Sequence, residues 1–105
     1  MSNPVPPSRV AQLRALAHPG RLSVLRAVVS GPAEGTPVGR IQEQVGLPAS
    51  TLSHHLADLA KAELVAAARQ GTTIRYRVRF DQLRGLTEFL WEDCCGGGCS
   101  DPDCC

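Results

Sequence analysis

All five cysteines of this 105-residue chain lie in its last twelve residues. They form an adjacent pair, Cys94 and Cys95, a single Cys99 after three glycines, and a second pair, Cys104 and Cys105. Disulfides stabilise a fold by closing long loops, and bonds confined to so short a segment would close none. Thiolates, in contrast, are soft ligands that select soft or borderline ions. The placement therefore predicts a reducing compartment and a tail, residues 94–105, that binds a thiophilic metal or metalloid.

The spacing of these cysteines narrows the choice of ion. Neighbouring thiolates suit three-coordinate binding better than a tetrahedron, and the three glycines supply the backbone freedom to bring a third ligand back. A tetrahedral Cys₄ zinc site usually has two Cys-x-x-Cys pairs, and this tail has none. Cd(II), Zn(II) and Cu(I) nevertheless stay as alternatives, as does a thiol redox switch built on an exposed cysteine cluster.

Charge is segregated along the chain, although the formal net charge is only +1. Residues 1–79 hold ten Lys or Arg against four Asp or Glu, and residues 80–105 hold one against six. A basic body suits a polyanionic partner such as nucleic acid, and an acidic tail suits a cation. No apolar run approaches membrane-spanning length, and the Pro-rich start has no signal-peptide core. We therefore expect a cytoplasmic protein without a membrane partner.

Hydrophobic periodicity divides the body into the elements that must position these groups. Residues 1–7 are expected to be disordered, and a first helix is expected to begin with Ser8 as its N-cap. A second helix is expected from about Arg21, because Pro19 and Gly20 interrupt the pattern before it. The apolar residues at helical spacing in these two helices are Val10, Leu13, Leu16, Ala17, Leu22, Leu25, Val28 and Val29.

A helix-turn-helix is predicted in the next segment. Thr36 is expected to cap a short helix that carries Pro37 in its first turn and stops at Gly46. A second helix is expected to open at Pro48 or Ser50. Two helices joined by a short turn around a glycine are typical of this motif. The inward residues would be Val38, Ile41 and Val45 in the first helix and Leu52, Leu56 and Leu59 in the second.

A β-hairpin and a last helix complete the body. Residues 64–69 and 73–79 flank a short turn, and Ile74, Tyr76 and Val78 alternate with arginines in the second run. This pattern indicates a half-buried strand with one arginine face, and a hairpin directly after a helix-turn-helix is a wing. The last helix, which Asp81 would cap, carries Leu83, Leu86, Phe89, Leu90 and Trp91. The expected fold is thus mainly α with a β-hairpin wing, a winged helix-turn-helix over residues 8–93.

The exposed face of the second motif helix has the side chains that a DNA-reading helix needs. Small or hydrogen-bonding groups near its N-terminus let a helix approach base edges in the major groove. Arginines on the wing and cations nearby would contact the DNA backbone. His55 lies near the apolar edge of the helix, where packing or a phosphate contact is expected rather than base reading. The candidate DNA-binding residues are Ser50, Thr51, Ser53, His54, His55, Arg40, Lys61, Arg69, Arg75 and Arg77.

Three segments together resemble the ArsR/SmtB family of metal-responsive repressors. They are Leu16-Ala17-His18-Pro19-Gly20-Arg21-Leu22-Ser23-Val24-Leu25, Gly46-Leu47-Pro48-Ala49-Ser50-Thr51-Leu52-Ser53-His54-His55-Leu56 and Leu59-Ala60-Lys61-Ala62-Glu63-Leu64-Val65. The resemblance covers roughly residues 8–95. It implies a homodimer formed through the first and last helices, with two recognition helices that read a palindromic operator. Two-fold symmetry would separate the half-sites by one helical turn, ~34–36 Å.

The cysteine pattern resembles one subgroup of that family. The helix at residues 38–45 has no cysteine and residues 81–93 have no histidine, so the effector sites that other subgroups carry there are not expected. An adjacent pair at the end of the last helix, Cys94 and Cys95, is similar to the arsenite-responsive subgroup. That resemblance implies trigonal binding of As(III), with Sb(III) as an alternative. Cys99 is chosen as the third thiolate, and Cys104 and Cys105 are the alternatives.

Two other classes of function fit the sequence less well. An enzyme is not expected, because no cysteine has a base beside it and all three histidines lie in the body. A metal-buffering protein that uses the helix-turn-helix as a scaffold would not need an arginine-lined wing. The favoured hypothesis is a repressor that trivalent arsenic releases from its operator.

Overall fold

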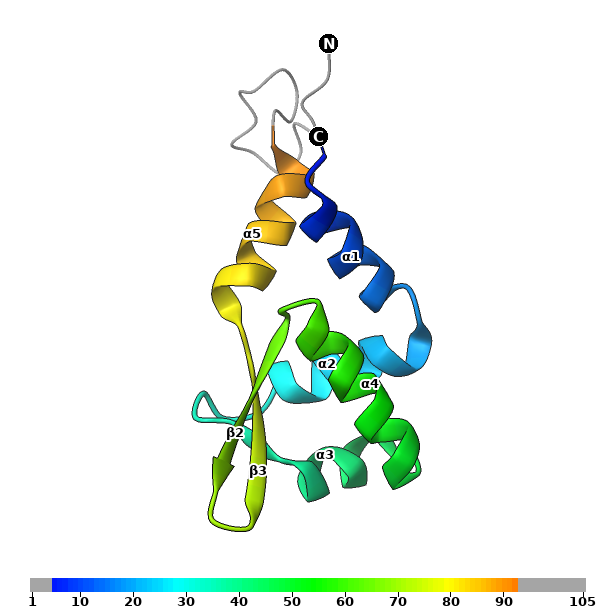
Figure 1. Cartoon of the computed structure of the whole chain (residues 1–105), viewed down its shortest axis with the longest axis vertical. Coiled ribbons are helices and arrows are strands. Elements are labelled where there is room, and N and C mark those ends of the chain that lie inside the picture. Colours follow the sequence, from blue (N-terminus) through cyan, green and yellow to red (C-terminus); the bar gives the residue numbers. More distant parts are fainter. Residues whose placement is uncertain (1–4, 93–105) are drawn as a thin grey trace.

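A computed structural model describes residues 5–92 of the chain, which fold into five helices and a small three-stranded antiparallel sheet (Figure 1). The elements are α1 Pro7–Leu16, α2 Pro19–Val29, β1 Thr36–Pro37, α3 Val38–Val45, α4 Ala49–Lys61, β2 Val65–Gln70, β3 Thr73–Val78 and α5 Phe80–Trp91. The predicted cysteine tail, residues 94–105, lies outside the described residues. No helix in the described part is long and apolar enough to cross a membrane.

The core lies where α2, α3 and α4 pack against the base of the hairpin. Ile41 of α3 and Leu52, Leu56 and Leu59 of α4 are at most 1% exposed. Val38 and Val45 of α3 are partly buried against the same cluster. The predicted inward faces of both motif helices are therefore confirmed. Gly46 ends α3 in the left-handed conformation, at φ 69°, which glycine adopts without a steric penalty.

The predicted hairpin is confirmed, but the sheet has a third strand that the sequence pattern missed. β2 and β3 pair antiparallel, with Val65 opposite Val78, and β1 lies on the other side of β3, with Thr36 opposite Tyr76. The prediction that Thr36 caps a helix is wrong, because Thr36 pairs with Tyr76 of β3 and α3 begins two residues later, at Val38. Pro37, at φ −61° and ψ 146°, keeps an extended backbone and is itself the N-cap.

Three other helix starts differ from the expected ones. α1 has Pro6 as its N-cap rather than Ser8, and α5 starts at Phe80, so that Asp81 lies in its first turn without capping it. α2 starts at Pro19 rather than Arg21, and His18 Nδ1 accepts a hydrogen bond from the Gly20 N–H at 3.1 Å. A proline in the first helical turn has its φ preset and lacks an N–H that would be unpaired there. A proline therefore starts α1, where a serine cap was expected, and also starts α2, whereas α5 starts without one.

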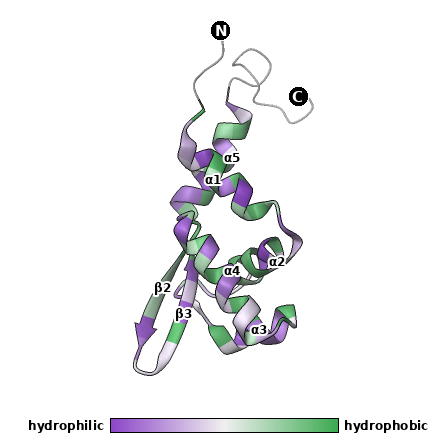
Figure 2. Ribbon diagram, turned by 45° about the vertical axis from the view of Figure 1, so that its right-hand side comes forward, coloured by the Kyte–Doolittle hydropathy of each residue, from purple (hydrophilic) through white to green (hydrophobic). Residues whose placement is uncertain are grey.

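The helices α1 and α5 extend beyond the core (Figure 2), and each leaves large apolar side chains exposed. α1 buries Gln12 and Ala15, whereas Leu13 on its other side is 39% exposed. α5 buries Leu86, whereas Leu90 is 57% exposed and Trp91 63% exposed. A folded domain rarely leaves side chains of this kind together on two neighbouring helices unless another surface covers them.

Candidate nucleic-acid interface

The exposed side of α4 carries the short polar side chains that the sequence singled out. Ser50, Ser53 and His54 are exposed, and Thr51 is half-buried. α4 has Pro48 as its N-cap and no side chain that caps its first turn. The N–H groups of that turn are therefore free to bind phosphate, and short side chains beside them let the helix approach base edges.

His55 has a different environment from its neighbour His54. It is only 9% exposed, and its ring centroid lies 5.0 Å from that of His18. A Cβ at Gly20 would lie 2.7 Å from His55 Nε2, so the glycine makes room for the ring. Burial, with a smaller effect of the charges of His18 and Arg21, lowers the pKa of His55 below its ordinary value of 6.5. His55 thus packs α4 against α2 in the single chain.

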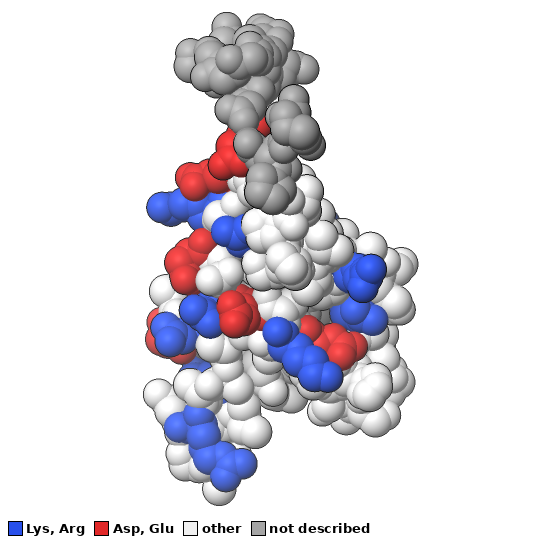
Figure 3. Space-filling view, turned by 45° about the horizontal axis from the view of Figure 1, so that its top comes forward, with Lys and Arg blue, Asp and Glu red and all other residues white. Residues whose placement is uncertain are grey.

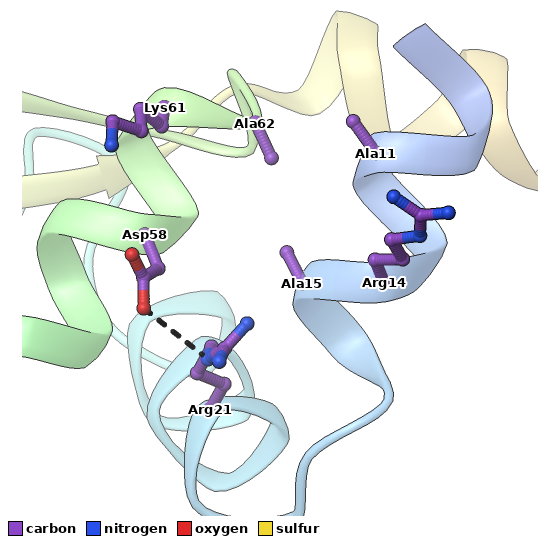
Figure 4. Close-up of a pocket in the computed structure, with 7 residues that line it drawn as sticks. All are labelled: Ala11, Arg14, Ala15, Arg21, Asp58, Lys61 and Ala62. Carbon is purple, nitrogen blue, oxygen red and sulfur yellow. Dashed lines mark ion pairs between the residues drawn. The ribbon is translucent and has the colours of Figure 1, made fainter. Parts of the chain in front are cut away.

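An ion pair reinforces the same contact between α2 and α4 (Figure 4). Arg21 Nε lies 3.6 Å from Asp58 Oδ2, which is too long for a hydrogen bond. The pair borders an open hollow of about 350 Å³ between α1, α2 and α4. In Figure 4 the side chains of Arg14 and Lys61 point away from this ion pair. Lys61 is exposed at the end of α4, and Asp58 belongs to the joint between the helices.

The wing arginines lie on two faces of the hairpin. Arg75 and Arg77 stand opposite Ala68 and Ala66, whereas Arg69 stands opposite Ile74 and therefore shares that residue's face. Arg69 and Arg77 are exposed. Figure 3 shows Lys and Arg side chains gathered on the lobe at its lower left, which is the hairpin. The hairpin therefore offers cationic groups from both faces.

Arg75 is more constrained than the other wing arginines. Its Nη1 donates to the Gly35 carbonyl at 3.2 Å, and its Nε donates to Gln70 Oε1 at 3.0 Å. Arg75 and Arg40 line one polar hollow of about 370 Å³ between the wing and α3, together with Gln44. The structure thus brings together Arg40 and Arg75, which the sequence could place only on separate elements.

The five tail cysteines, which are the candidate metal ligands, lie outside the described residues. Within residues 5–92, no three His, Cys, Asp or Glu side chains lie close enough together to hold a metal ion. Two residues of the interface region escaped the sequence reading, namely Gly35, whose carbonyl holds Arg75, and Arg21, which pairs with Asp58. Neither has a sequence signal, because both contacts join residues more than 30 positions apart.

Comparison with known proteins agrees with this geometry. Residues 16–66 match a family model described as a helix-turn-helix domain. The chain is 38% identical over 88 residues to the HTH-type transcriptional regulator KmtR of Mycobacterium tuberculosis, covering 80% of this chain and 65% of KmtR. It is 35% identical over 85 residues to the HTH-type transcriptional regulator CmtR of Mycobacterium bovis, covering 79% of this chain and 70% of CmtR. The chain thus spans less than two thirds of the length of KmtR.

Solved structures extend the likeness to three dimensions. NolR from Sinorhizobium fredii superposes with a TM-score of 0.65 at 30% identity, over 92% of this chain and 100% of NolR. The homodimeric winged helix-turn-helix domain of Mb0332 from Mycobacterium bovis, described as a possible ArsR-family regulator, superposes with a TM-score of 0.66 at 28% identity, over 80% of this chain and 82% of that domain. With its winged helix-turn-helix fold and these relatives, the chain belongs to the ArsR/SmtB family, whose members are DNA-binding transcriptional regulators rather than enzymes.

Proposed function

We propose that the chain is a homodimeric repressor that binds a palindromic operator and releases it when trivalent arsenic binds thiolates of its C-terminal tail. The observation that carries the DNA-binding part is the exposed polar side of α4, with Ser50, Ser53 and His54, in a domain whose hairpin carries arginines on both faces. A helix of this composition fits the major groove, and cations on a neighbouring wing fit the phosphate backbone.

The DNA contacts divide into two classes in this proposal. Ser50, Thr51, Ser53 and His54 read base edges, because their hydroxyl and imidazole groups both donate and accept hydrogen bonds. The cations contact phosphates and contribute affinity that falls with salt. These phosphate-binding residues are Arg40, Lys61, Arg69, Arg75 and Arg77. His55 supports the helix from behind, since its ring is buried against α2.

The exposed apolar surface of α1 and α5 supports dimerisation through these two helices. Leu13, Leu90 and Trp91 would be covered by the same helices of a second copy. The structural relative Mb0332 is described as homodimeric. Two recognition helices related by a two-fold axis read two half-sites, so the operator would be palindromic.

The effector site in this proposal follows directly after α5. Cys94 and Cys95 come three and four positions after Trp91, and Cys99 supplies the third thiolate, with Cys104 and Cys105 as alternatives. Three thiolates suit a soft, three-coordinate metalloid such as As(III) or Sb(III), and binding would displace the thiol protons. Thiols stay reduced in the cytoplasm, where we propose that the protein acts. Cd(II), Zn(II), Cu(I) or thiol oxidation are the competing signals.

A titration tests the proposal. Binding of the dimer to a fluorescent operator duplex would be followed by anisotropy while arsenite is added under reducing conditions. We expect arsenite to weaken binding on the order of 5–150-fold, the range of a typical allosteric coupling. Cys94→Ser and Cys95→Ser should keep the arsenite-free affinity and lose the response, whereas Ser100→Ala, a tail control, should change neither.

Three outcomes contradict parts of this proposal. Unchanged operator affinity over the whole arsenite titration contradicts arsenic as the effector. A stronger response to Cd(II), Zn(II) or Cu(I) at equal concentration assigns the tail to that ion instead. Loss of operator binding by Cys94→Ser without any arsenite would make the cysteine pair structural.

A further inference from the structure

Gln12 is the most deeply buried polar side chain in the described part of the chain, with 1% of its surface exposed. Its Nε2 donates to the Ala62 carbonyl at 3.2 Å and to Gln82 Oε1 at 2.9 Å. Its Oε1 accepts a hydrogen bond from Arg9 Nη1 at 3.0 Å. One amide on α1 therefore joins the end of α4 to the first turns of α5.

The hydrogen bond from Gln12 to Ala62 reaches the C-terminal end of α4, the recognition helix of the proposed function. Ala62 is the C-cap of α4, and carbonyls at a helix C-terminus lack partners within the helix. The chain turns here through Glu63 at φ 66°, and the Leu64 N–H donates to the Leu59 carbonyl at 3.0 Å. The Gln12 amide supplies the Ala62 carbonyl with a partner from outside the turn. It thereby fixes the position of this helix end relative to α1.

The contact between α1 and α5 is polar in the same region. Arg9 Nη1 also donates to the Gln82 carbonyl at 3.3 Å. A Cβ on Gly85 would collide with the Arg9 guanidinium, so this glycine lets the side chain lie against α5. A leucine at position 12 would bury as readily as the amide, without these directional bonds. Buried networks whose groups are all paired specify one arrangement of the elements that they join.

We propose that Gln12 is a positioning residue that holds α4 at a fixed offset from the α1–α5 pair and transmits displacement of α5 to α4. This inference rests on the proposed function, in which α1 and α5 form the dimer and the effector binds after α5. In such a dimer the α1–α5 pair is the common frame. The offset of each α4 from that frame then sets the distance between the two recognition helices. A ligand at the far end of α5 acts on that distance through Gln82 and Gln12.

Two measurements on Gln12→Leu test the inference. The first compares binding to operator duplexes whose half-sites stand at the natural separation or one base pair closer or further apart. The second is the ratio of operator affinities with and without arsenite. Thr87→Ala is the matched control, because the Thr87 hydroxyl donates only to the Arg84 carbonyl of its own helix. Sedimentation and circular dichroism verify that each variant is a folded dimer.

We expect wild type and Thr87→Ala to lose at least about tenfold in affinity when the spacing changes, and Gln12→Leu to lose less than about threefold. The arsenite ratio of Gln12→Leu should fall below about twofold, from the typical 5–150-fold. Wild-type spacing discrimination in a folded Gln12→Leu dimer overturns the inference. If arsenite does not change the affinity of the wild type, the arsenic proposal fails, and the spacing series still decides the role of Gln12.

A second variant covers the case in which Gln12→Leu does not fold. Gln82→Met removes the acceptor on α5 and leaves the bond from Gln12 to Ala62 intact. We expect it to keep most of the spacing discrimination and to lose most of the arsenite response. A wild-type arsenite ratio in Gln82→Met, with wild type itself responding, would contradict transmission through this amide.

Discussion

The ring of His55 lies 5.0 Å from the ring of His18, and its buried Nδ1 has no hydrogen-bond partner among the described residues. The two rings join the recognition helix α4 to the start of α2. Protonation of His55 would place a charge in this joint beside Arg21. Burial and these neighbours lower the pKa of His55 in the folded chain.

This lowered pKa predicts acid sensitivity. The folded chain holds the His55 proton less tightly than the unfolded chain. The contribution of neutral His55 to the free energy of unfolding is therefore fully present above pH 6.5, the ordinary pKa. It is lost as the pH falls from there toward the folded pKa. His55→Leu, of similar size and without a titrating group, should lose less unfolding free energy between pH 7.5 and 5.5 than wild type does.

Urea unfolding at the two pH values measures this difference, and His54→Leu is the control on the exposed side of the same helix. Equal pH dependence in wild type and His55→Leu would show that the acid sensitivity originates elsewhere.

The motif helices could be predicted from sequence because their apolar residues repeat on one face that the domain itself buries. The same reasoning grouped Leu13 of α1 with other apolar residues at helical spacing and gave Gln12 no role, whereas the structure buries Gln12 and leaves Leu13 39% exposed. A periodic stripe tells which residues share a face but not which partner covers it. In α1 the buried Gln12 donates hydrogen bonds to Ala62 and Gln82, which lie 50 and 70 positions further along the chain. Local patterning carries no trace of such contacts.

In the candidate site, likewise, some residues could be predicted from the sequence and others could not. Ser50 and His54 were identified from their place on the helix, and the structure exposes both. The hydrogen bond from Arg75 to the Gly35 carbonyl depends on the pairing of β1 with β3. A strand of two residues is too short to give a sequence pattern from which this pairing could be predicted. The role of the cysteines stays a prediction, because it rests on the spacing of residues 94–105 and on a family resemblance, and these residues lie outside the described part of the chain.

The wing predicts a graded salt dependence of DNA binding. Arg77→Ala should reduce the slope of log affinity against log salt by about 1.8, because each dimer loses two phosphate contacts at about 0.9 each. Arg75→Ala should also weaken the wing itself, since it loses bonds to Gly35 and Gln70. Arg84→Ala, an exposed control on α5, should leave the slope unchanged. An unchanged slope in Arg77→Ala would remove this arginine from the interface.

Glu63 predicts a stabilising substitution. It is the one residue other than glycine with a positive φ, 66°, in the described part of the chain. A side chain in this conformation costs about 1–2 kcal/mol, of which the extra freedom of an unfolded glycine returns about 0.4–1 kcal/mol. Glu63→Gly should therefore raise the free energy of unfolding by about 0.5–1 kcal/mol. Gly46→Ala, at φ 69°, should lower it by a similar amount, and both are measured by urea denaturation.

The surroundings of Gly31 predict that a substitution at this position destabilises the fold. A Cβ at this position would collide with Thr36 Oγ1, a buried hydroxyl with no hydrogen-bond partner among the described residues. Gly31→Ala should cost about 1–3 kcal/mol by overpacking. In the Thr36→Ala background the cost should fall, because the two positions couple through that one contact. Gly39→Ala, where a Cβ meets nothing within 4 Å, is the control. Additive costs of Gly31→Ala and Thr36→Ala would contradict the collision.

The exposed end of α5 predicts how the dimer depends on apolar contact. Leu90→Glu places a charge on a side chain that is 57% exposed in the single chain and that a second copy would bury. We expect the dimer dissociation constant to rise at least about tenfold, equivalent to about 1.4 kcal/mol. Leu22→Glu changes a leucine of α2 with 42% exposure and should leave dimerisation within about twofold of wild type. Sedimentation equilibrium measures both constants. If Leu22→Glu dissociates the dimer and Leu90→Glu does not, the interface involves α2 instead of α5, and the positioning role of Gln12 would need a different frame.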